Sequence, residues 1–335
     1  MFKTYQHAEE LPERWDAVVA DQFFLSKRVL EKLEKLNPCR QQYHLHREKK
    51  LALVSYQIKL DIFTFAEGFS LKLPIRVIGI PLSVSGRGYK AEPEDLEELS
   101  LYIRSLQGFY VVLNAGEGLR LASGNTLPTC KIDLGWYTFG CYVNSMRSHY
   151  RYRVKKAIEK FSEVKIEKLA DVGLFDEEMY CLYEAVYENS KEKLEKLTIH
   201  FFREFPATIF TFKVHGKIVG FVQLLEKKKE LIFLFGGFDH SINQKYDLYM
   251  NMLLQIIRYG IEQGCHSIDL GQTAEETKLK LGAIQYPQRM YVHHSNNLLN
   301  KIISSRVAPF SYKKYEVFHK VFKGEKDENS AGKMP

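Results

Sequence analysis

One segment of the sequence brings together the elements that commonly hold a phosphate. Residues 231–235 (LIFLF) form an apolar run that predicts a strand, and Gly236 and Gly237 follow it. A polar loop then leads into a helix with apolar residues at helical spacing, ended by Gly264. Backbone N–H groups and the helix dipole favour an anion at such a helix N-terminus. We therefore expect the chemistry to be centred where this loop meets the helix.

A second segment, residues 142–161 (YVNSMRSHYRYRVKKAIEKF), is strongly basic. At helical spacing its apolar residues form one stripe. Two rows of cations lie beside that stripe: Arg147, Arg151 and Lys155, and then Arg153, Lys156 and Lys160. These rows could cradle the phosphates of a nucleotide-bearing ligand, or they could be a solvated helix face. The sequence leaves both interpretations open.

The composition is that of an ordinary globular protein: 335 residues, of which 45% are hydrophobic and 27% charged. A net charge of +7 favours anionic ligands without proving a nucleic-acid binder. The five cysteines are scattered, which is typical of a reducing compartment, and the N-terminus has no apolar signal core. We expect a cytoplasmic protein with no membrane insertion. No HExxH, paired Cys/His set or Walker A motif is present, so we expect no metal.

Both halves of the chain are predicted to follow one order: helix, antiparallel strands, helix, strand. In the first half a helix at 94–106 runs into a strand at 109–113, and in the second a helix at 247–263 runs into a strand at 267–270. A further helix is predicted at 176–197, and His215-Gly216 predicts a hairpin. We predict an α+β fold with two similar domains, 1–140 and 141–322, and a disordered tail at 323–335.

Three patches resemble a known family: LPTCKIDLG (127–135), the basic segment 142–161, and residues 237–283, which begin GFDHSINQKYDLYM and end ETKLKLGA. Together they resemble the Fem-type branch of the GNAT acyltransferases, in its BioF2-like, single-chain bacterial form. The resemblance implies two tandem GNAT folds, each a mixed central sheet flanked by helices, with the acyl donor held by the C-terminal one. It also implies transfer of an acyl or aminoacyl group from a carrier to an amine of a small molecule or precursor.

The donor implied by the resemblance is acyl-CoA, an acyl carrier protein or an aminoacyl-tRNA. Ordinary GNAT enzymes grip the CoA pyrophosphate with a Q/R-x-x-G-x-G/A turn, and the matching residues here are 244–249 (QKYDLY). Asp247 and Tyr249 replace the small residues that close approach to a pyrophosphate requires. This departure weakens a standard CoA grip and leaves room for a carrier-protein or tRNA donor.

The resemblance also implies catalytic positions. Phe235, Gly236 and Gly237 are expected at the splayed strand that aligns the donor, so Gly237→Val should abolish turnover while the fold survives. Asp239 is the first candidate for the base that deprotonates the amine, and His240 the second. Turn formation or helix capping is the alternative role of both residues. Tyr249 could protonate the leaving group, or it could pack in the core.

Donor and acceptor positions follow in the same way. Gln244, Lys245, Tyr246 and Lys278 are expected to bind the donor, together with Arg147 and Arg151 of the basic segment. Lys278 could instead bind an anionic group of the acceptor, or it could be an ordinary surface lysine. Glu275 is expected to border the acceptor. So are three tyrosines at helical spacing in 176–197: Tyr180, Tyr183 and Tyr187. A stripe of aromatic residues at this spacing could instead pack in the core. The leading hypothesis is an N-acyltransferase that uses a thioester carrier. The alternatives are an aminoacyl-tRNA-dependent transferase and a non-catalytic nucleic-acid-binding module using 147–160.

Overall fold

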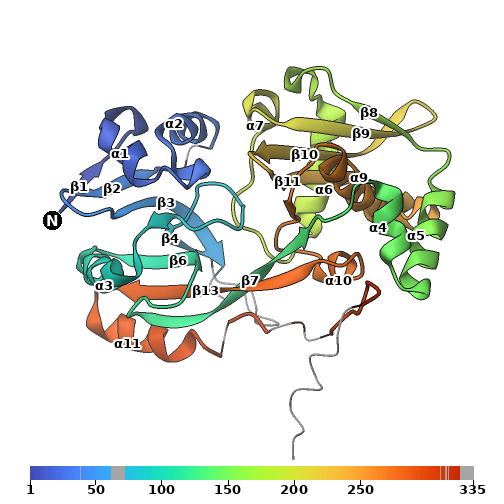
Figure 1. Cartoon of the computed structure of the whole chain (residues 1–335). Coiled ribbons are helices and arrows are strands. Elements are labelled where there is room, and N and C mark those ends of the chain that lie inside the picture. The colour runs from blue at the N-terminus through green and yellow to red at the C-terminus, as the bar shows by residue number, and fades with distance from the viewer. Residues whose placement is uncertain (38, 62–71, 310, 314, 316, 325–335) are drawn as a thin grey trace, which may run out of the picture.

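The computed structural model describes residues 1–37, 39–61, 72–309, 311–313, 315 and 317–324. The thirteen strands in this part of the chain belong to one sheet, which runs through two lobes. Figure 1 shows the lobes side by side, with β7 (Ala122–Asp133) and β13 (Ile284–His294) reaching from one into the other. The strand order is β1-β2-β3-β4-β6-β13-β7-β12-β11-β10-β9-β8, with β5 paired to β3.

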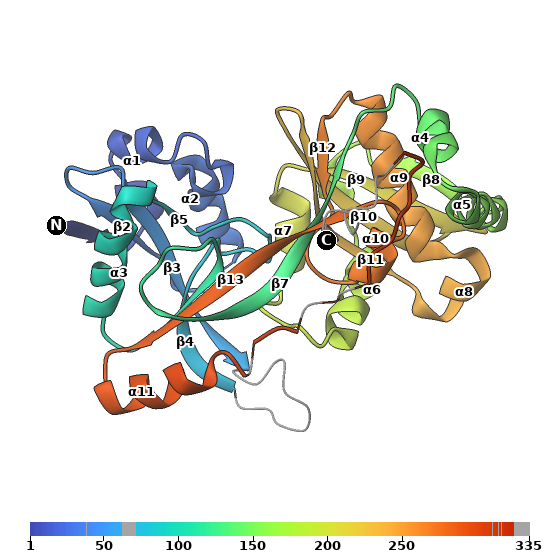
Figure 2. The same cartoon turned by 60° about the horizontal axis from the view of Figure 1, so that its bottom comes forward.

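The first lobe contains the N-terminal elements: β1 (Phe2–Tyr5), α1 (Glu13–Val18), α2 (Lys27–Leu36), β2 (Gln42–His46), β3 (Ala52–Asp61), β4 (Lys72–Ile78), β5 (Tyr89–Lys90), α3 (Leu96–Ser105) and β6 (Phe109–Ala115). The chain returns to this lobe near its C-terminus. There β13 pairs with both β6 and β7, and α11 (Asn297–Arg306) follows it. Figure 2 shows α11 beneath β13 in the first lobe.

The second lobe contains the remaining elements: α4 (Phe139–Ser145), α5 (Ser148–Lys160), β8 (Lys165–Lys168), α6 (Glu177–Asn189), α7 (Ile199–Glu204), β9 (Thr208–Val214), β10 (Lys217–Lys227), β11 (Glu230–Phe238), α8 (Asn243–Tyr246), α9 (Leu248–Glu262), β12 (Ser267–Asp269) and α10 (Glu275–Leu279). The hairpin β9–β10 turns at His215 and Gly216, which both have positive φ. This is the conformation that a tight two-residue hairpin requires.

The α+β prediction is confirmed, because a large mixed sheet is flanked by helices in both lobes. The sheet itself does not stop at residue 140, since β7 pairs with β12 and β13 lies within the first lobe. The division into domains 1–140 and 141–322 stays a prediction. Of the tail predicted at 323–335, residues 325–335 lie outside the described part of the chain.

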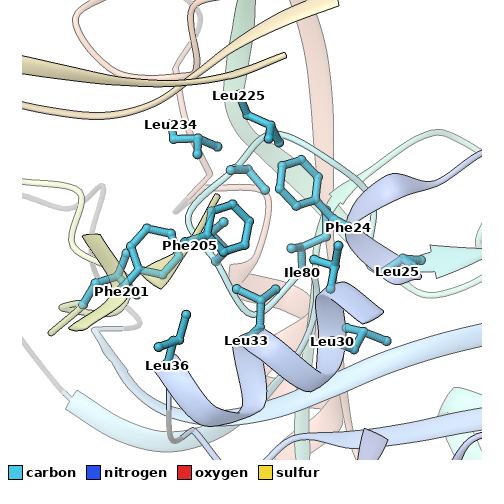
Figure 3. Close-up of a cluster of buried hydrophobic side chains, with 14 of the residues drawn as sticks. Phe24, Leu25, Leu30, Leu33, Leu36, Ile80, Phe201, Phe205, Leu225 and Leu234 are labelled. Atoms are coloured by element: carbon cyan, nitrogen blue, oxygen red, sulfur yellow. The ribbon is translucent and has the colours of Figure 1, made fainter. Parts of the chain in front are cut away.

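A buried apolar cluster joins the two lobes (Figure 3). Leu33 and Leu36 of α2 and Ile80 come from the first lobe. They share the cluster with Phe205, beside α7, and Leu234 of β11 from the second. All five side chains are at most 6% exposed. Burial of this kind stabilises by roughly 1.5–3 kcal/mol for each large apolar side chain, so the cluster fixes the position of the lobes.

Three local predictions are wrong. The basic segment is two helices, α4 and α5, because Met146 and Arg147 have extended backbones between them. The helix predicted at 176–197 ends at Asn189, and residues 190–198 form a loop. Strand β11 does not end at Phe235, as the apolar run 231–235 predicts, since Gly236 and Gly237 also pair with β10.

Gly237 lets a helix approach the sheet closely. A Cβ on this residue would lie 2.5 Å from the backbone nitrogen of Tyr183 and 2.6 Å from the backbone carbon of Leu182 on α6. The backbone of α6 leaves no room for a side chain here. Gly237→Val is therefore expected to disturb folding, contrary to the sequence-based expectation that the fold survives.

None of the helices in the described ranges is long and apolar enough to cross a membrane.

Candidate active site

A cleft with a volume of about 1070 Å³ lies between the lobes. Its first-lobe wall comes from β3, β4, β6, β13 and α11, and its second-lobe wall from α6, the loop after α6, β11 and the segment between β12 and α10. The volume is at the upper end of that of ordinary small-molecule sites. Substrates of considerable size can therefore bind here.

Strand β11 opens into this cleft. It pairs in parallel with β12 only from Glu230 to Ile232, and Phe233 to Gly236 then line the cleft. A bulge makes the opening irregular, because Phe233 and Phe235 oppose consecutive residues of β10 and Leu234 is the extra residue. The two parallel strands thus separate after Ile232 and Asp269, several residues before the predicted position at 235–237. An open strand edge offers backbone N–H and C=O groups to a ligand.

Asp269 fixes the opposite side of this opening. Its carboxylate accepts hydrogen bonds from Ser85 Oγ at 2.6 Å, from Thr129 Oγ1 at 2.7 Å and from the Gly271 backbone N–H at 2.8 Å. Gly271 has φ +75°, a conformation that glycine adopts without strain. Because Ser85 belongs to the first-lobe segment after β4, its hydrogen bond to Asp269 also ties the two walls of the cleft together.

Lys278 places a buried cation beside the open strand edge. Its side chain comes from α10 and is 2% exposed. A Cβ on Gly271 would lie 4.0 Å from Lys278 Nζ and 3.9 Å from the carbonyl oxygen of Phe233, so all three meet at the opening. Burial lowers the pKa of Lys278 to about 8, although Asp269 and Glu275 oppose this shift. Within the described residues the ammonium group has neither a hydrogen bond nor an ion pair, so it is available to a ligand.

Glu195 supplies a buried carboxyl group to the same cleft. Ser83 Oγ donates a hydrogen bond to Oε1 at 3.0 Å, whereas buried Oε2 has no partner among the described residues. Burial raises the pKa of Glu195 to about 7, because its carboxylate is removed from water, and the hydrogen bond from Ser83 offsets this shift only in part. A carboxyl group that titrates near neutrality is suited to accept a proton from an amine.

The loop 190–198 holds Glu195 in place through α6. Tyr180 Oη donates to the Leu197 carbonyl at 2.9 Å, and the Leu197 N–H donates to Tyr183 Oη at 3.1 Å. Tyr183 and Tyr187 also line the cleft. Sequence reasoning missed Glu195, because the run ENSKEKLEKL at 188–197 resembles a solvated helix face. Only the flanking Leu194 and Leu197 indicated a buried segment.

The two residues predicted as the base lie outside this cleft lining. Asp239 caps a short 3-10 turn, His240–Ile242, and accepts hydrogen bonds from the N–H and Oγ of Ser241. These hydrogen bonds hold the pKa of Asp239 below its usual range. His240 is exposed and lies against the ring of Phe238. The structure shows the capping geometry, and the catalytic role of both residues stays a prediction.

The helix N-terminus predicted to hold phosphate is occupied by protein. The short helix α8 directly precedes α9, and Asn243 accepts hydrogen bonds from the N–H groups of Asp247 and Tyr249. Lys160 pairs with the Asp247 carboxylate at 3.0 Å. Tyr246 is buried and donates to Glu163, while Gln244 and Lys245 are exposed away from the cleft. With these N–H groups used and a carboxylate beside them, the turn offers a poor cradle for a pyrophosphate.

Other predicted residues are divided between the cleft and structural positions. Tyr249 lines the cleft and stacks on Phe238, and its burial raises the pKa of its hydroxyl. Glu275 instead accepts hydrogen bonds from Gln285 and Tyr312. Arg147 and Arg151 donate to backbone carbonyls, of Phe322 and of Asn144 and Met146 respectively. The structure therefore brings Tyr249, Lys278, Phe235 and Gly236 together with two of the three predicted tyrosines.

The described part of the chain has no group of three or more His, Cys, Asp or Glu side chains arranged to hold a metal ion.

Comparisons with known proteins agree with this geometry. A family model described as an acetyltransferase (GNAT) domain matches residues 145–279, which include Glu195 and Lys278. No curated protein matches the chain. Among solved structures, FemX has a TM-score of 0.53 at 11% identity, over 90% of this chain and all of FemX.

Two further structures share the fold over nearly the whole chain. The L-PGS structure from Bacillus licheniformis has a TM-score of 0.53 at 11% identity, covering 89% of this chain and 97% of that one. The C-terminal domain of a proposed lysylphosphatidylglycerol synthetase from Agrobacterium fabrum has a TM-score of 0.54 at 12% identity, covering 87% and 95%. These likenesses concern the fold. The match to the family model shows that the chain carries a GNAT acetyltransferase domain over residues 145–279, and the chain is therefore an acyltransferase.

Proposed function

We propose that this acyltransferase moves an acyl group from a carrier to the amine of a small molecule or precursor, in the cleft between the lobes. The observation that supports this most strongly is the open edge of β11 with the buried Lys278 beside it, which has no ion-pair partner among the described residues. Backbone groups and a cation at one point suit the carbonyl oxygen of an acyl donor, which becomes negative as the amine attacks.

The proposed reaction uses two buried charges of the cleft. Glu195, as a carboxylate, accepts a proton from the ammonium form of the acceptor. The free amine attacks the acyl carbonyl, and the negative oxygen that forms is stabilised by Lys278 and the β11 backbone. When the tetrahedral intermediate collapses, the new C–N bond remains and the bond to the carrier breaks. The second proton of the amine passes to the departing thiolate or alkoxide.

For the donor, we propose a thioester carrier, acyl-CoA or acyl carrier protein. Protein groups already bind the N–H groups and the Asp247 carboxylate at the N-terminus of α9. We therefore expect contacts other than those of an ordinary CoA site to hold the carrier. The resemblance to the Fem-type, BioF2-like branch supports a bacterial, cytoplasmic enzyme, and the scattered free cysteines are consistent with that compartment.

Aminoacyl-tRNA is the second candidate donor, supported by helix α5. Arg153, Lys155 and Lys156 are exposed on this helix, and Tyr152 is 65% exposed beside them. Helix α5 and the residues after α10 meet at Phe322: Arg147 at the start of α5 donates to the Phe322 carbonyl, and Gly282 lies against the Phe322 ring. A nucleic acid bound along α5 would therefore extend toward the segment that carries Lys278. FemX and the lysylphosphatidylglycerol synthetases share this fold, which supports the same candidate.

The test is turnover of the full chain with acyl-CoAs of increasing length, an acyl carrier protein and charged tRNA, in the presence of a pool of amines. We expect one donor class to be consumed with release of its carrier. Lys278→Met should lower kcat by about 10²–10³-fold, as loss of one charge-stabilising group does, and Lys278→Arg should restore part of the rate. Full activity in Lys278→Met with the productive donor would disprove the assignment of this site.

Substitutions on helix α5 distinguish the two donor classes. Replacing Lys155 and Lys156 together by Ala should weaken tRNA binding and make the slope of log affinity against log salt shallower by roughly one for each phosphate that is no longer neutralised. The same variant should use small acyl-CoA donors at the parental rate. Lys228→Ala with Lys229→Ala removes equal charge at the β10–β11 turn and is the matched control. Equal effects of the two double variants would exclude α5 as a specific tRNA site.

A further inference from the structure

One part of the cleft is apolar and belongs to the first lobe. Its walls are Tyr56, Val111 and Val292 on the sheet, with Ile303 and Val307 on and just after α11. Figures 1 and 2 both show α11 lying along β13, which carries Val292. Further apolar residues extend the same surface: Pro74, Phe109, Leu113, Met290 and Leu299. We call this region the apolar arm.

Glu195 lies where the apolar arm meets the second lobe. Tyr56 and Glu195 both line the cleft, and burial together with the Glu195 charge raises the pKa values of Tyr56 and Cys39. Both of these residues belong to the same apolar cluster as Val111 and Val292. The loop that carries Glu195 is bonded to α6, because the Leu197 N–H donates a hydrogen bond to Tyr183 Oη. Lys278 lies by contrast on α10, beside the open strand edge. The arm therefore begins at the acidic group of the cleft and not at its buried cation.

From this arrangement we propose that the acceptor is a hydrophobic primary amine, whose ammonium group binds Glu195 Oε2 and whose apolar substituent occupies the apolar arm. The buried oxygen without a partner in the described residues requires a donor, and an ammonium group supplies both hydrogen bonds and the missing positive charge. An apolar substituent would remove the walls of the arm from water. This inference rests on the proposed function and names the class of its acceptor.

Ionisation of Glu195 gives this binding a pH dependence. Burial raises the pKa of Glu195 to about 7, so the carboxylate that binds an ammonium group forms as the pH rises through neutrality. The groups that face it are Ser83 and Cys39 from the first lobe, Tyr56 of β3, and Tyr183 and Tyr187 of α6. None of these is a cation, so amine affinity should increase between about pH 6 and pH 8.

The experiment is calorimetric titration of the full chain, without any acyl donor, with propylamine, hexylamine and nonylamine and with alkyl carboxylates of equal length. At pH 8 we expect the Kd of the amines to fall by up to about fourfold for each added methylene, and the carboxylates to bind more weakly. Glu195→Gln should weaken binding of all three amines by at least about tenfold. Because no donor is present, this result is independent of whether acyl transfer is ever observed.

Two tryptophan variants on α11 test whether the alkyl substituent of the amine occupies the apolar arm. Ile303→Trp fills the arm and should abolish the dependence on amine length, whereas Leu298→Trp, at a position 69% exposed outside the cleft, should preserve it. Amine affinity that is independent of length would overturn the proposal. Carboxylates that bind as tightly as amines, unaffected by Glu195→Gln, would also overturn it and assign the arm to the acyl group of the donor.

Discussion

The turn after β11 and the cleft beside β11 are both rich in polar groups, but they differ in how those groups are satisfied. In the turn, Asp239 binds Ser241, Asn243 binds the start of α9, and Asp247 pairs with Lys160. In the cleft, Lys278 and one oxygen of Glu195 are buried without such partners among the described residues. Buried charges of this kind destabilise a fold, so their presence together in one cavity indicates a use in binding or catalysis.

The largest difference between the cleft and the turn should be in the effect of carboxylate substitutions on kcat. Glu195→Gln removes the proton acceptor while keeping the shape of the side chain, and a general base typically contributes about 10²–10⁴-fold to a rate. Asp239→Asn should change kcat by less than about threefold, because that carboxylate caps a turn. The measurement is kcat and KM of each variant with the productive donor and amine. A larger loss of kcat in Asp239→Asn than in Glu195→Gln would contradict the assignment of catalysis to the cleft.

The free energy of unfolding should respond to Glu195→Gln in the opposite direction to kcat: the substitution that lowers the rate should stabilise the fold. A pKa raised from 4.5 to about 7 means that ionised Glu195 destabilises the folded state by up to roughly 3 kcal/mol above pH 7. Wild-type stability should therefore decline as the pH rises from 4.5 to 7, because the unfolded chain ionises this group first. Glu195→Gln lacks that decline and should be the more stable protein at pH 8.

Denaturant unfolding at pH 4.5 and at pH 8 measures this effect. The two proteins should differ little at pH 4.5 and most at pH 8. A Glu195→Gln variant that is less stable than wild type at pH 8 would show that the carboxylate has a compensating partner, and that it resembles Asp239 after all.

The helices and strands around the turn and the cleft could be predicted from the sequence better than the roles of their side chains. Periodicity placed α9 and β12 correctly, because a strong apolar stripe and flanking glycines specify local structure. It did not show that α8 would cover the start of α9, since such an arrangement depends on Asn243 and Tyr246 folding back onto the helix. The resemblance predicted a binding role for Lys278, and the structure added that this lysine is buried beside the cleft.

Glu195 illustrates what periodicity alone does not show. Its neighbours are charged and its segment continues the helical pattern of α6, so nothing local distinguishes it from a solvated glutamate. It is buried only because residues 190–198 leave the helix and fold against Ser83 of the other lobe. The two residues are 112 positions apart in the sequence, and their hydrogen bond exists only once both lobes are assembled.

The smallest effect concerns the turn itself. Asn251 is 4% exposed, and its Nδ2 donates to the carbonyls of Ala157 and Tyr246 at 2.9 and 3.0 Å, which joins α5, α8 and α9. Asn251→Ala leaves these buried carbonyls with fewer donors and should cost about 1–3 kcal/mol of stability. Because none of these groups lines the cleft, kcat below the melting transition should be unchanged. Thermal unfolding, followed by assay well below the variant's midpoint, separates the two properties. Loss of activity in a fully folded Asn251→Ala protein would mean that the turn acts on the donor, and the division between a structural turn and a functional cleft would have to be abandoned.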